Sequence, residues 1–90
     1  MANSASAKKR IRQNEKRRVL NRRVRTRVRT WLNKFDRAME SGDVTSAEQQ
    51  LREVESQLDR AVSKGVIPKK RASRKASRLA KRLNKLRAEA

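Results

Sequence analysis

Residues 20–43 read LNRRVRTRVRTWLNKFDRAMESGD and combine a periodic apolar pattern with a glycine that can end a helix. Apolar residues recur at positions 20, 24, 28, 31, 35 and 38, and every step is three or four residues. This spacing places them on one face of an α-helix. Ser41-Gly42 follows directly, and glycine readily takes the left-handed conformation found at helix C-termini. The stretch therefore predicts an amphipathic helix that ends near residue 41.

The same periodicity continues on the C-terminal side of Gly42. Apolar residues occupy positions 44, 47, 51, 54, 58 and 61, and then positions 72, 76, 79, 83 and 86. The second glycine and the one proline, Gly65 and Pro68, separate these two stripes. We therefore expect helices over about 5–41, 44–64 and 68–88. Because short connections favour antiparallel neighbours, the predicted fold is all-α, a three-helix antiparallel bundle in a single domain over residues 1–90.

Residues near the predicted helix ends supply candidate caps. Asp43 or Thr45 can cap the second helix, and Thr45 with Glu48 has the spacing of a capping box. Gly65 can end this helix. Pro68 suits the first turn of the third helix, because its missing N–H is not needed there.

The charge of the chain is large and unevenly distributed. The 90 residues include 27 Lys or Arg against 9 Asp or Glu, a net charge of +18. Residues 8–29 hold 12 basic side chains and one acid, Glu15, and residues 64–87 hold 11 basic side chains and no acid. Residues 36–60 reverse the balance, with seven acids against three arginines. Two basic segments around an acidic spacer predict a protein that binds a polyanion through its phosphates.

The first predicted helix is longer than its apolar stripe. N-terminal to Leu20, the same face carries Arg17, Gln13 and Arg10. At 1.5 Å per residue this helix spans about 50 Å and the second about 30 Å, so roughly a dozen N-terminal residues have no bundle to pack on. We expect this overhanging helix, basic on every side, to lie in a groove or between helices of folded RNA and to become ordered on binding.

The third predicted helix carries its charge along one flank. At 100° per residue, a continuous basic arc starts beside the apolar stripe, whereas the opposite flank is mostly small or polar. We expect the arc to face RNA. Over both segments, the candidate RNA-binding residues are Lys8, Lys9, Arg10, Arg12, Gln13, Lys16, Arg17, Arg18, Asn21, Arg22, Arg23, Arg25, Arg29, Lys70, Arg71, Arg74, Lys75, Arg78, Arg82 and Lys85.

Other functions lack the residues that they require. Trp31 and Phe35 are the only aromatics and lie on the apolar stripe, so we expect them in the core and expect recognition by RNA shape rather than base stacking. Without cysteine, histidine or a Gly-rich phosphate loop, we expect no enzyme activity, cofactor, metal or small-molecule substrate. No apolar run approaches a membrane span or a secretory signal, so we expect a cytoplasmic protein that does not bind membranes.

Two alternatives involve DNA. A basic region followed by a heptad-like stripe superficially fits a dimeric basic-zipper protein. However, Gly42 cuts the stripe after about three heptads, and the second basic segment has no place in that design. A histone-like or nonspecific DNA compactor is a weaker alternative, since it would not require one overhanging helix and one helix charged along a single flank.

Short motifs also occur in a consistent order along the chain. They are Ser6-Ala-Lys-Lys-Arg10, Gln13-Asn-Glu-Lys-Arg-Arg18, Asn21, Arg29-Thr30, Gly42-Asp43, Asp59-Arg-Ala61, Lys64-Gly-Val-Ile67 and Ala72-Ser-Arg-Lys-Ala-Ser-Arg-Leu79. Together, from Ala5 to Leu86, they resemble the bacterial small-subunit ribosomal protein S-twenty family.

This resemblance implies a three-helix bundle that binds 16S ribosomal RNA directly, early in assembly of the 30S subunit. It also implies a monomer within the ribosome with few or no protein contacts. In the proteins that the chain resembles, RNA contacts come mainly from the first and third helices. Carried onto this sequence, these contacts fall on Lys8 to Arg29 and on Arg71, Arg74, Lys75, Arg78 and Arg82.

Overall fold

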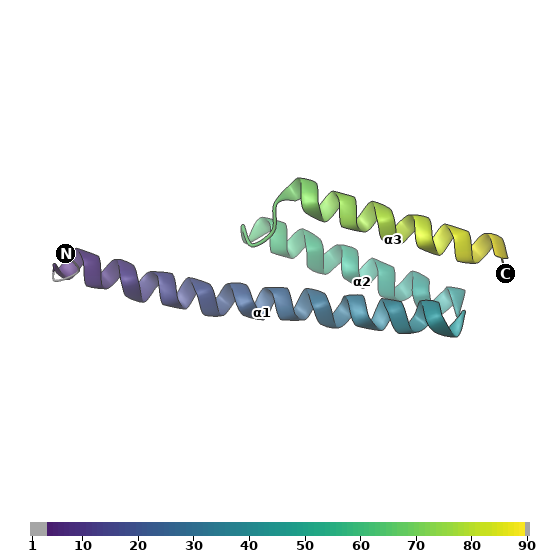
Figure 1. The fold of residues 1–90 in the computed structure, drawn as a ribbon, viewed down its shortest axis with the longest axis horizontal. Helices are drawn as coiled ribbons and strands as arrows, with labels where there is room; N and C mark the ends of the chain where they lie inside the picture. The colour runs from purple at the N-terminus through teal and green to yellow at the C-terminus, as the bar shows by residue number, and fades with distance from the viewer. Residues whose placement is uncertain (1–3, 90) are drawn as a thin grey trace.

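The computed structural model describes residues 4–89, which form three helices, α1 (Ala5–Ser41), α2 (Val44–Ser63) and α3 (Lys69–Glu89) (Figure 1). Each helix begins and ends within one residue of the expected bounds, and residues 4–89 contain no strand. The all-α prediction is therefore confirmed. The expected domain over 1–90 also includes residues 1–3 and 90, which lie outside the described residues.

The two ends of α1 are capped by residues that suit those positions. The Ser4 hydroxyl accepts a hydrogen bond from the backbone N–H of Ala7 at 3.2 Å, satisfying one of the free donors of the first turn. Gly42 has a φ of 74°, and its N–H donates to the Met39 carbonyl at 3.1 Å. As predicted, the helix ends where glycine allows the left-handed conformation.

One predicted cap of α2 is confirmed and the other is wrong. Asp43 is the N-cap, since its Oδ1 accepts the N–H of Ser46 at 3.1 Å. Thr45 lies inside the helix and forms no capping box with Glu48. The reason is local, because with Asp43 as the N-cap the third helical residue is Ser46 rather than Glu48, and the Glu48 carboxylate binds Arg87 on α3.

The connection between α2 and α3 is a compact hydrogen-bonded turn. Gly65 has a φ of 73° and donates to the Val62 carbonyl at 2.9 Å, while the Val66 N–H donates to the Ala61 carbonyl at 2.9 Å. These two bonds define a Schellman motif. Val66 turns inward and is buried, which the apolar stripes did not predict. Pro68 precedes α3 rather than lying in its first turn, and its carbonyl accepts the Ala72 N–H at 3.1 Å.

The core is formed along α2, which packs against both α1 and α3 and runs antiparallel to each (Figure 1). Every helical residue of this core belongs to a predicted stripe. Phe35 is fully buried, and Trp31 is partly buried against the core. The buried cluster comprises Val28, Phe35, Ala38, Ala47, Leu51, Val54, Leu58, Ala61, Ala72, Leu79 and Leu83.

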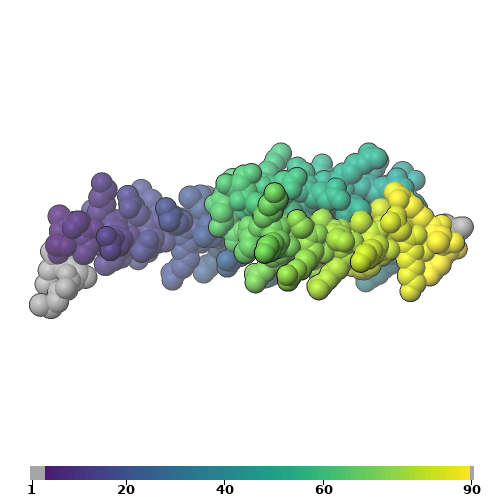
Figure 2. Space-filling view, turned by 90° about the horizontal axis from the view of Figure 1, so that it is seen from above, coloured from purple at the N-terminus to yellow at the C-terminus, as the bar shows by residue number. Residues whose placement is uncertain are grey.

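The N-terminal part of α1 projects beyond this bundle (Figures 1 and 2). Val24 is the first residue of α1 that packs against the core, and we call residues 5–23 the N-terminal arm. The arm is longer than the expected dozen residues because Leu20, placed on the predicted stripe, lies outside the bundle and is 57% exposed. The radius of gyration is therefore 17.8 Å, against about 12 Å for a compact chain of this length.

Candidate nucleic-acid interface

Four arginines form a row along α1. Arg18, Arg22, Arg25 and Arg29 are three or four residues apart, so they lie on one side of the helix, and all four are exposed. We call these four residues the arginine row. A groove along this side is lined by Asn14, Arg17, Arg18, Asn21, Arg22, Arg25, Thr26 and Arg29. It combines guanidinium groups, which bind phosphate, with amides that can hydrogen-bond a 2′-hydroxyl or a base edge.

The other side of the arm is chemically different. Val19 and Leu20 are turned by about 100° and 200° from Arg18, and they are 51% and 57% exposed. With Arg12, Glu15 and Lys16 they line a shallow, mainly apolar hollow. Basic residues therefore occur on this side of the arm too, as predicted, but here Arg12 and Lys16 are interspersed with the single acid, Glu15, and two exposed aliphatic side chains.

The predicted arc on α3 includes four residues that share one side of the helix. Arg71, Lys75, Arg78 and Arg82 are separated by four, three and four residues, and all are exposed. We call them the basic flank. The buried side of α3, formed by Ala72, Leu79 and Leu83, packs on the core.

An ion pair joins the basic flank to α1. Arg82 Nη1 donates to Asp36 Oδ1 at 3.0 Å, and the Arg82 guanidinium carbon lies 5.6 Å from the centre of the Phe35 ring. Asp36 follows Arg29 by seven residues, which is two helical turns, so it lies on the same side of α1 as the arginine row. Since Arg82 reaches that side from α3, the arginine row and the basic flank border one continuous side of the molecule.

A second ion pair holds the C-terminal end of α3 to α2. Arg87 donates to Glu48 Oε1 through Nη2 at 2.6 Å and through Nε at 2.9 Å. Arg87 is turned by about 140° from Arg82, so it lies on the opposite flank of α3, away from the basic flank. Its charge is neutralised by α2, which leaves the basic flank as the more strongly cationic side of the helix.

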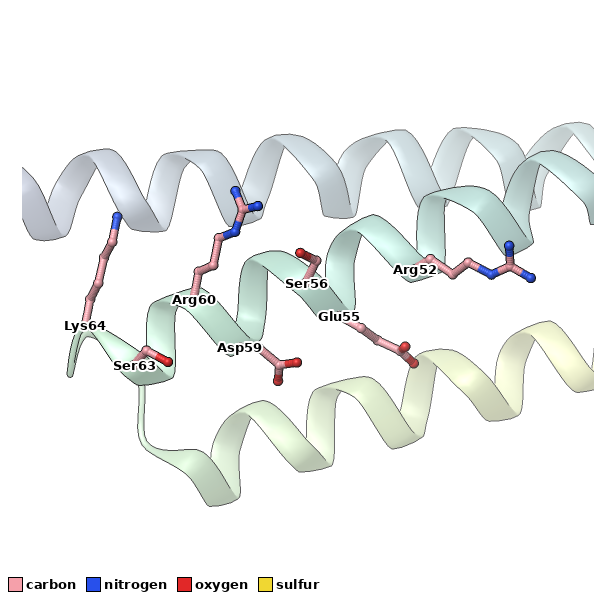
Figure 3. A pocket seen from close by; sticks show the side chains of 7 residues that line it. All are labelled: Arg52, Glu55, Ser56, Asp59, Arg60, Ser63 and Lys64. Atoms are coloured by element: carbon pink, nitrogen blue, oxygen red, sulfur yellow. The ribbon is translucent and has the colours of Figure 1, made fainter.

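The outer surface of α2 mixes charges of both signs. Figure 3 shows these side chains, with Glu55 and Asp59 extending on the side of α3 and Arg60 and Lys64 on the side of α1. Alternating charges of this kind give a weak net field, in contrast to the arginine row. The surface is lined by Arg52, Glu55, Ser56, Asp59, Arg60, Ser63 and Lys64.

The remaining predicted site residues lie elsewhere on the arm and on α3, outside the arginine row and the basic flank. Arg23 is turned by about 100° from Arg22 and borders a separate depression on α1. Asp36 was absent from the prediction, because its partner Arg82 is 46 residues away in the sequence. The other exposed candidates on the arm and on α3 are Lys8, Lys9, Arg10, Arg12, Gln13, Lys16, Arg17, Lys70, Arg74 and Lys85.

The packing of α1 also bears on the basic-zipper alternative. A zipper would need the apolar stripe of α1 to be free to pair with a second copy. In the structure, Phe35 and Val28 of this stripe are 0% and 6% exposed, because α2 and α3 cover them.

None of the three helices, taken over residues 4–89, is long and apolar enough to cross a membrane.

The sequence is similar to that of known proteins over nearly its whole length. The family model described as Ribosomal protein S20 matches residues 2–84. Proteins named small ribosomal subunit protein bS20 match this chain from Dinoroseobacter shibae (50% identity, covering 96% of this chain and 98% of the relative), Ruegeria sp. (51%, 96% and 99%) and Thermobifida fusca (50%, 96% and 94%). Since these are ribosomal proteins, the prediction of a non-enzyme is confirmed. The chain belongs to the ribosomal protein S20 family.

Proposed function

We propose that this protein is a structural constituent of the 30S ribosomal subunit in the cytoplasm, that it binds 16S ribosomal RNA directly, and that it supports early assembly of the subunit. The observation that carries the proposal is the placement of the arginine row and the basic flank along one side of the molecule. The names of the relatives, which are small-subunit ribosomal proteins, support the choice of partner.

Binding rests mainly on phosphate contacts. Each guanidinium or ammonium group that neutralises a phosphate releases counterions, and the planar guanidinium can donate two hydrogen bonds to one phosphate. Gln13 and Asn21, which lie among arginines, add hydrogen bonds to ribose hydroxyls or base edges. Because the chain carries a net charge of +18 on a thin core, RNA also relieves the self-repulsion of the folded protein.

The protein acts as a monomer that makes few or no protein contacts. Most residues of its apolar stripes, such as Phe35 and Val54, are buried within its own bundle, and Leu20 is the exposed exception on the arm. The outer surface of α2 is polar and of mixed charge, so it offers no large apolar patch for a stable protein interface.

Competition binding tests the choice of nucleic acid. A labelled fragment of 16S ribosomal RNA is titrated with the full chain at several salt concentrations, and unlabelled tRNA and duplex DNA are added as competitors. We expect the logarithm of the affinity to fall steeply with the logarithm of salt, and both competitors to be weak at moderate salt. Equal competition by duplex DNA would contradict the proposal and favour the DNA-compactor alternative.

Association with the subunit is tested separately. The tagged chain is expressed in a bacterium and ribosomal particles are sedimented through a high-salt gradient. We expect the protein to remain with the 30S particles, because a folded RNA site engages many phosphates at once. Release of the protein into the top fractions at a salt concentration that leaves other small-subunit proteins bound would contradict a structural role.

A further inference from the structure

Asp36 is an acid on the side of the molecule that carries the basic surfaces. It lies in line with Arg29 and Arg18 on α1, seven and eighteen residues away, which are whole numbers of helical turns to within about 20°. An isolated carboxylate at this place repels phosphate and should weaken RNA binding. A carboxylate at this position therefore requires a favourable contribution to RNA binding that offsets the repulsion of phosphate. The contact of Asp36 with Arg82 supplies one.

The Arg82 side chain is held at two points on α1. Its Nη1 donates to Asp36 Oδ1 at 3.0 Å, and its guanidinium carbon lies 5.6 Å from the ring centre of the fully buried Phe35. An ion pair and a ring contact made by one planar group restrict where that group can lie. Within residues 4–89, this is the one ion pair formed directly between α1 and α3.

The orientation of Arg82 also sets that of the rest of the basic flank. Arg78, Lys75 and Arg71 precede it by four, seven and eleven residues, so a rotation of α3 that moves Arg82 moves all of them together. The Arg82 side chain is 50% exposed, and the contact with Asp36 uses only one of the two terminal nitrogens of its guanidinium. Arg82 can therefore keep its contact with Asp36 and still meet a phosphate.

We propose that Asp36 is a positioning residue for RNA binding, which acts through Arg82 to hold the basic flank of α3 in register with the arginine row of α1. This inference rests on the proposed function. Asp36 does not contact RNA. It fixes the relative orientation of the two helices that do, so that one folded RNA meets both surfaces at once.

The test compares two matched variants of the full chain, Asp36→Asn and Glu40→Gln. Glu40 is exposed, lies one turn after Asp36 and is turned by about 40° from it, and each variant removes one negative charge. Charge removal alone should leave binding to a 16S ribosomal RNA fragment unchanged or make it tighter in both variants. We expect Glu40→Gln to follow this rule and Asp36→Asn to weaken binding by up to about fivefold, the scale of an exposed ion pair. Binding by Asp36→Asn that is as tight as that of Glu40→Gln would overturn the proposal.

A double-variant cycle tests whether Asp36 acts through Arg82. In an Arg82→Gln background, Asp36→Asn should no longer weaken binding, because the contact that it breaks is already absent. The same loss in both backgrounds would overturn the proposal.

The salt dependence separates positioning from mere stabilisation. If the two surfaces no longer bind together, the salt slope of Asp36→Asn should become shallower by about 0.9 for each phosphate that is no longer neutralised, with unchanged helicity by circular dichroism. An unchanged slope together with a lower melting temperature would show that the pair is only structural. Failure of the unaltered chain to prefer the 16S fragment over duplex DNA would instead contradict the proposed function.

Discussion

The two halves of α1 have the same backbone conformation but different surroundings. In the packed half, residues 24–41, the inward positions carry side chains such as Val28 and Phe35, which are buried under α2 and α3. In the N-terminal arm, the equivalent positions carry Arg10, Gln13 and Arg17, and all three are exposed. The comparison shows that the helical pattern of a sequence and the burial of that helix are separate properties.

The difference also has a thermodynamic consequence. Most helical stability in proteins comes from packing of an apolar face, and the arm has no such packing. Repulsion between like charges four residues apart, as between Arg18 and Arg22 in the arm, lowers the stability of the helix further. We therefore expect the arm to fray in the free protein and to become ordered when phosphates neutralise it. Circular dichroism should then show a gain of helicity on addition of RNA, and full helicity in the free protein would contradict this expectation.

Removal of most of the arm should have the largest effect on binding. A variant that lacks residues 1–17 loses six basic side chains, and none of the residues described among them, 4–17, packs in the core. We expect its affinity for a 16S ribosomal RNA fragment to fall on the order of a thousandfold, because several phosphates lose their cationic partners together. Circular dichroism should show that the helicity of the remaining bundle is retained.

A full-length control separates charge from length. When the same six basic residues, Lys8, Lys9, Arg10, Arg12, Lys16 and Arg17, are replaced by glutamine, the arm keeps its length and loses six of its nine basic side chains. We expect a similar loss of affinity from this variant. Unimpaired binding by the deletion variant would show that residues 1–17 do not contribute to RNA binding.

Truncation of Phe35 should have the largest effect on stability. Phe35 is 0% exposed, and Phe35→Ala should cost about 3–5 kcal/mol through the burial that is removed and the cavity that remains. A thin-core domain of this size has little stability to lose, so we expect the variant to be largely unfolded at room temperature by circular dichroism. Addition of the 16S fragment should restore part of the helicity, because a ligand that binds only the folded state stabilises it. A melting temperature equal to that of the unaltered chain would contradict the assignment of Phe35 to the core.

The three-helix bundle that follows the N-terminal arm was predictable from sequence because its signals are local. Apolar residues spaced three or four positions apart predicted the stripes. Gly42 and Gly65 predicted the helix ends, since a positive φ angle is a local requirement of the backbone at those positions. Asp43 follows Gly42 directly, and aspartate is a preferred N-cap residue, so the N-cap of α2 is also a local signal. These features need no knowledge of which helix lies beside which.

Other features were not predictable because they depend on distant partners. Leu20 fits the stripe, but its exposure follows from where α2 and the turn after it end. The Glu48 carboxylate binds Arg87, which is 39 residues away. For the candidate interface, the sequence placed the charges on two helices. Only the contact between Asp36 and Arg82 shows that the arginine row and the basic flank share one side.

Two pairs of arginines on α1 test whether RNA meets one side of the helix or surrounds it. Arg18 and Arg25 belong to the arginine row, whereas Arg23 and Arg27 are turned away from it by about 100° or more. Replacing either pair with glutamine removes two charges. We expect about a tenfold loss of affinity from the Arg18 and Arg25 pair and about a threefold loss from the other, measured at one fixed salt concentration. Equal losses would show that RNA surrounds this part of α1.

Leu20 should have the smallest effect on the stability of the free protein. It is 57% exposed and lies beyond the packed part of α1, so Leu20→Ala removes no core contact. We expect the free energy of unfolding, measured in urea by circular dichroism, to change by less than about 0.5 kcal/mol. Leu51→Ala provides the contrast, because Leu51 is 8% exposed in the core and its truncation should cost about 2–4 kcal/mol. A loss above about 1 kcal/mol for Leu20→Ala would mean that the arm packs on the bundle in solution, since an exposed side chain has no such contribution to lose. The boundary between the two halves of α1 would then lie N-terminal to Leu20 rather than at Val24.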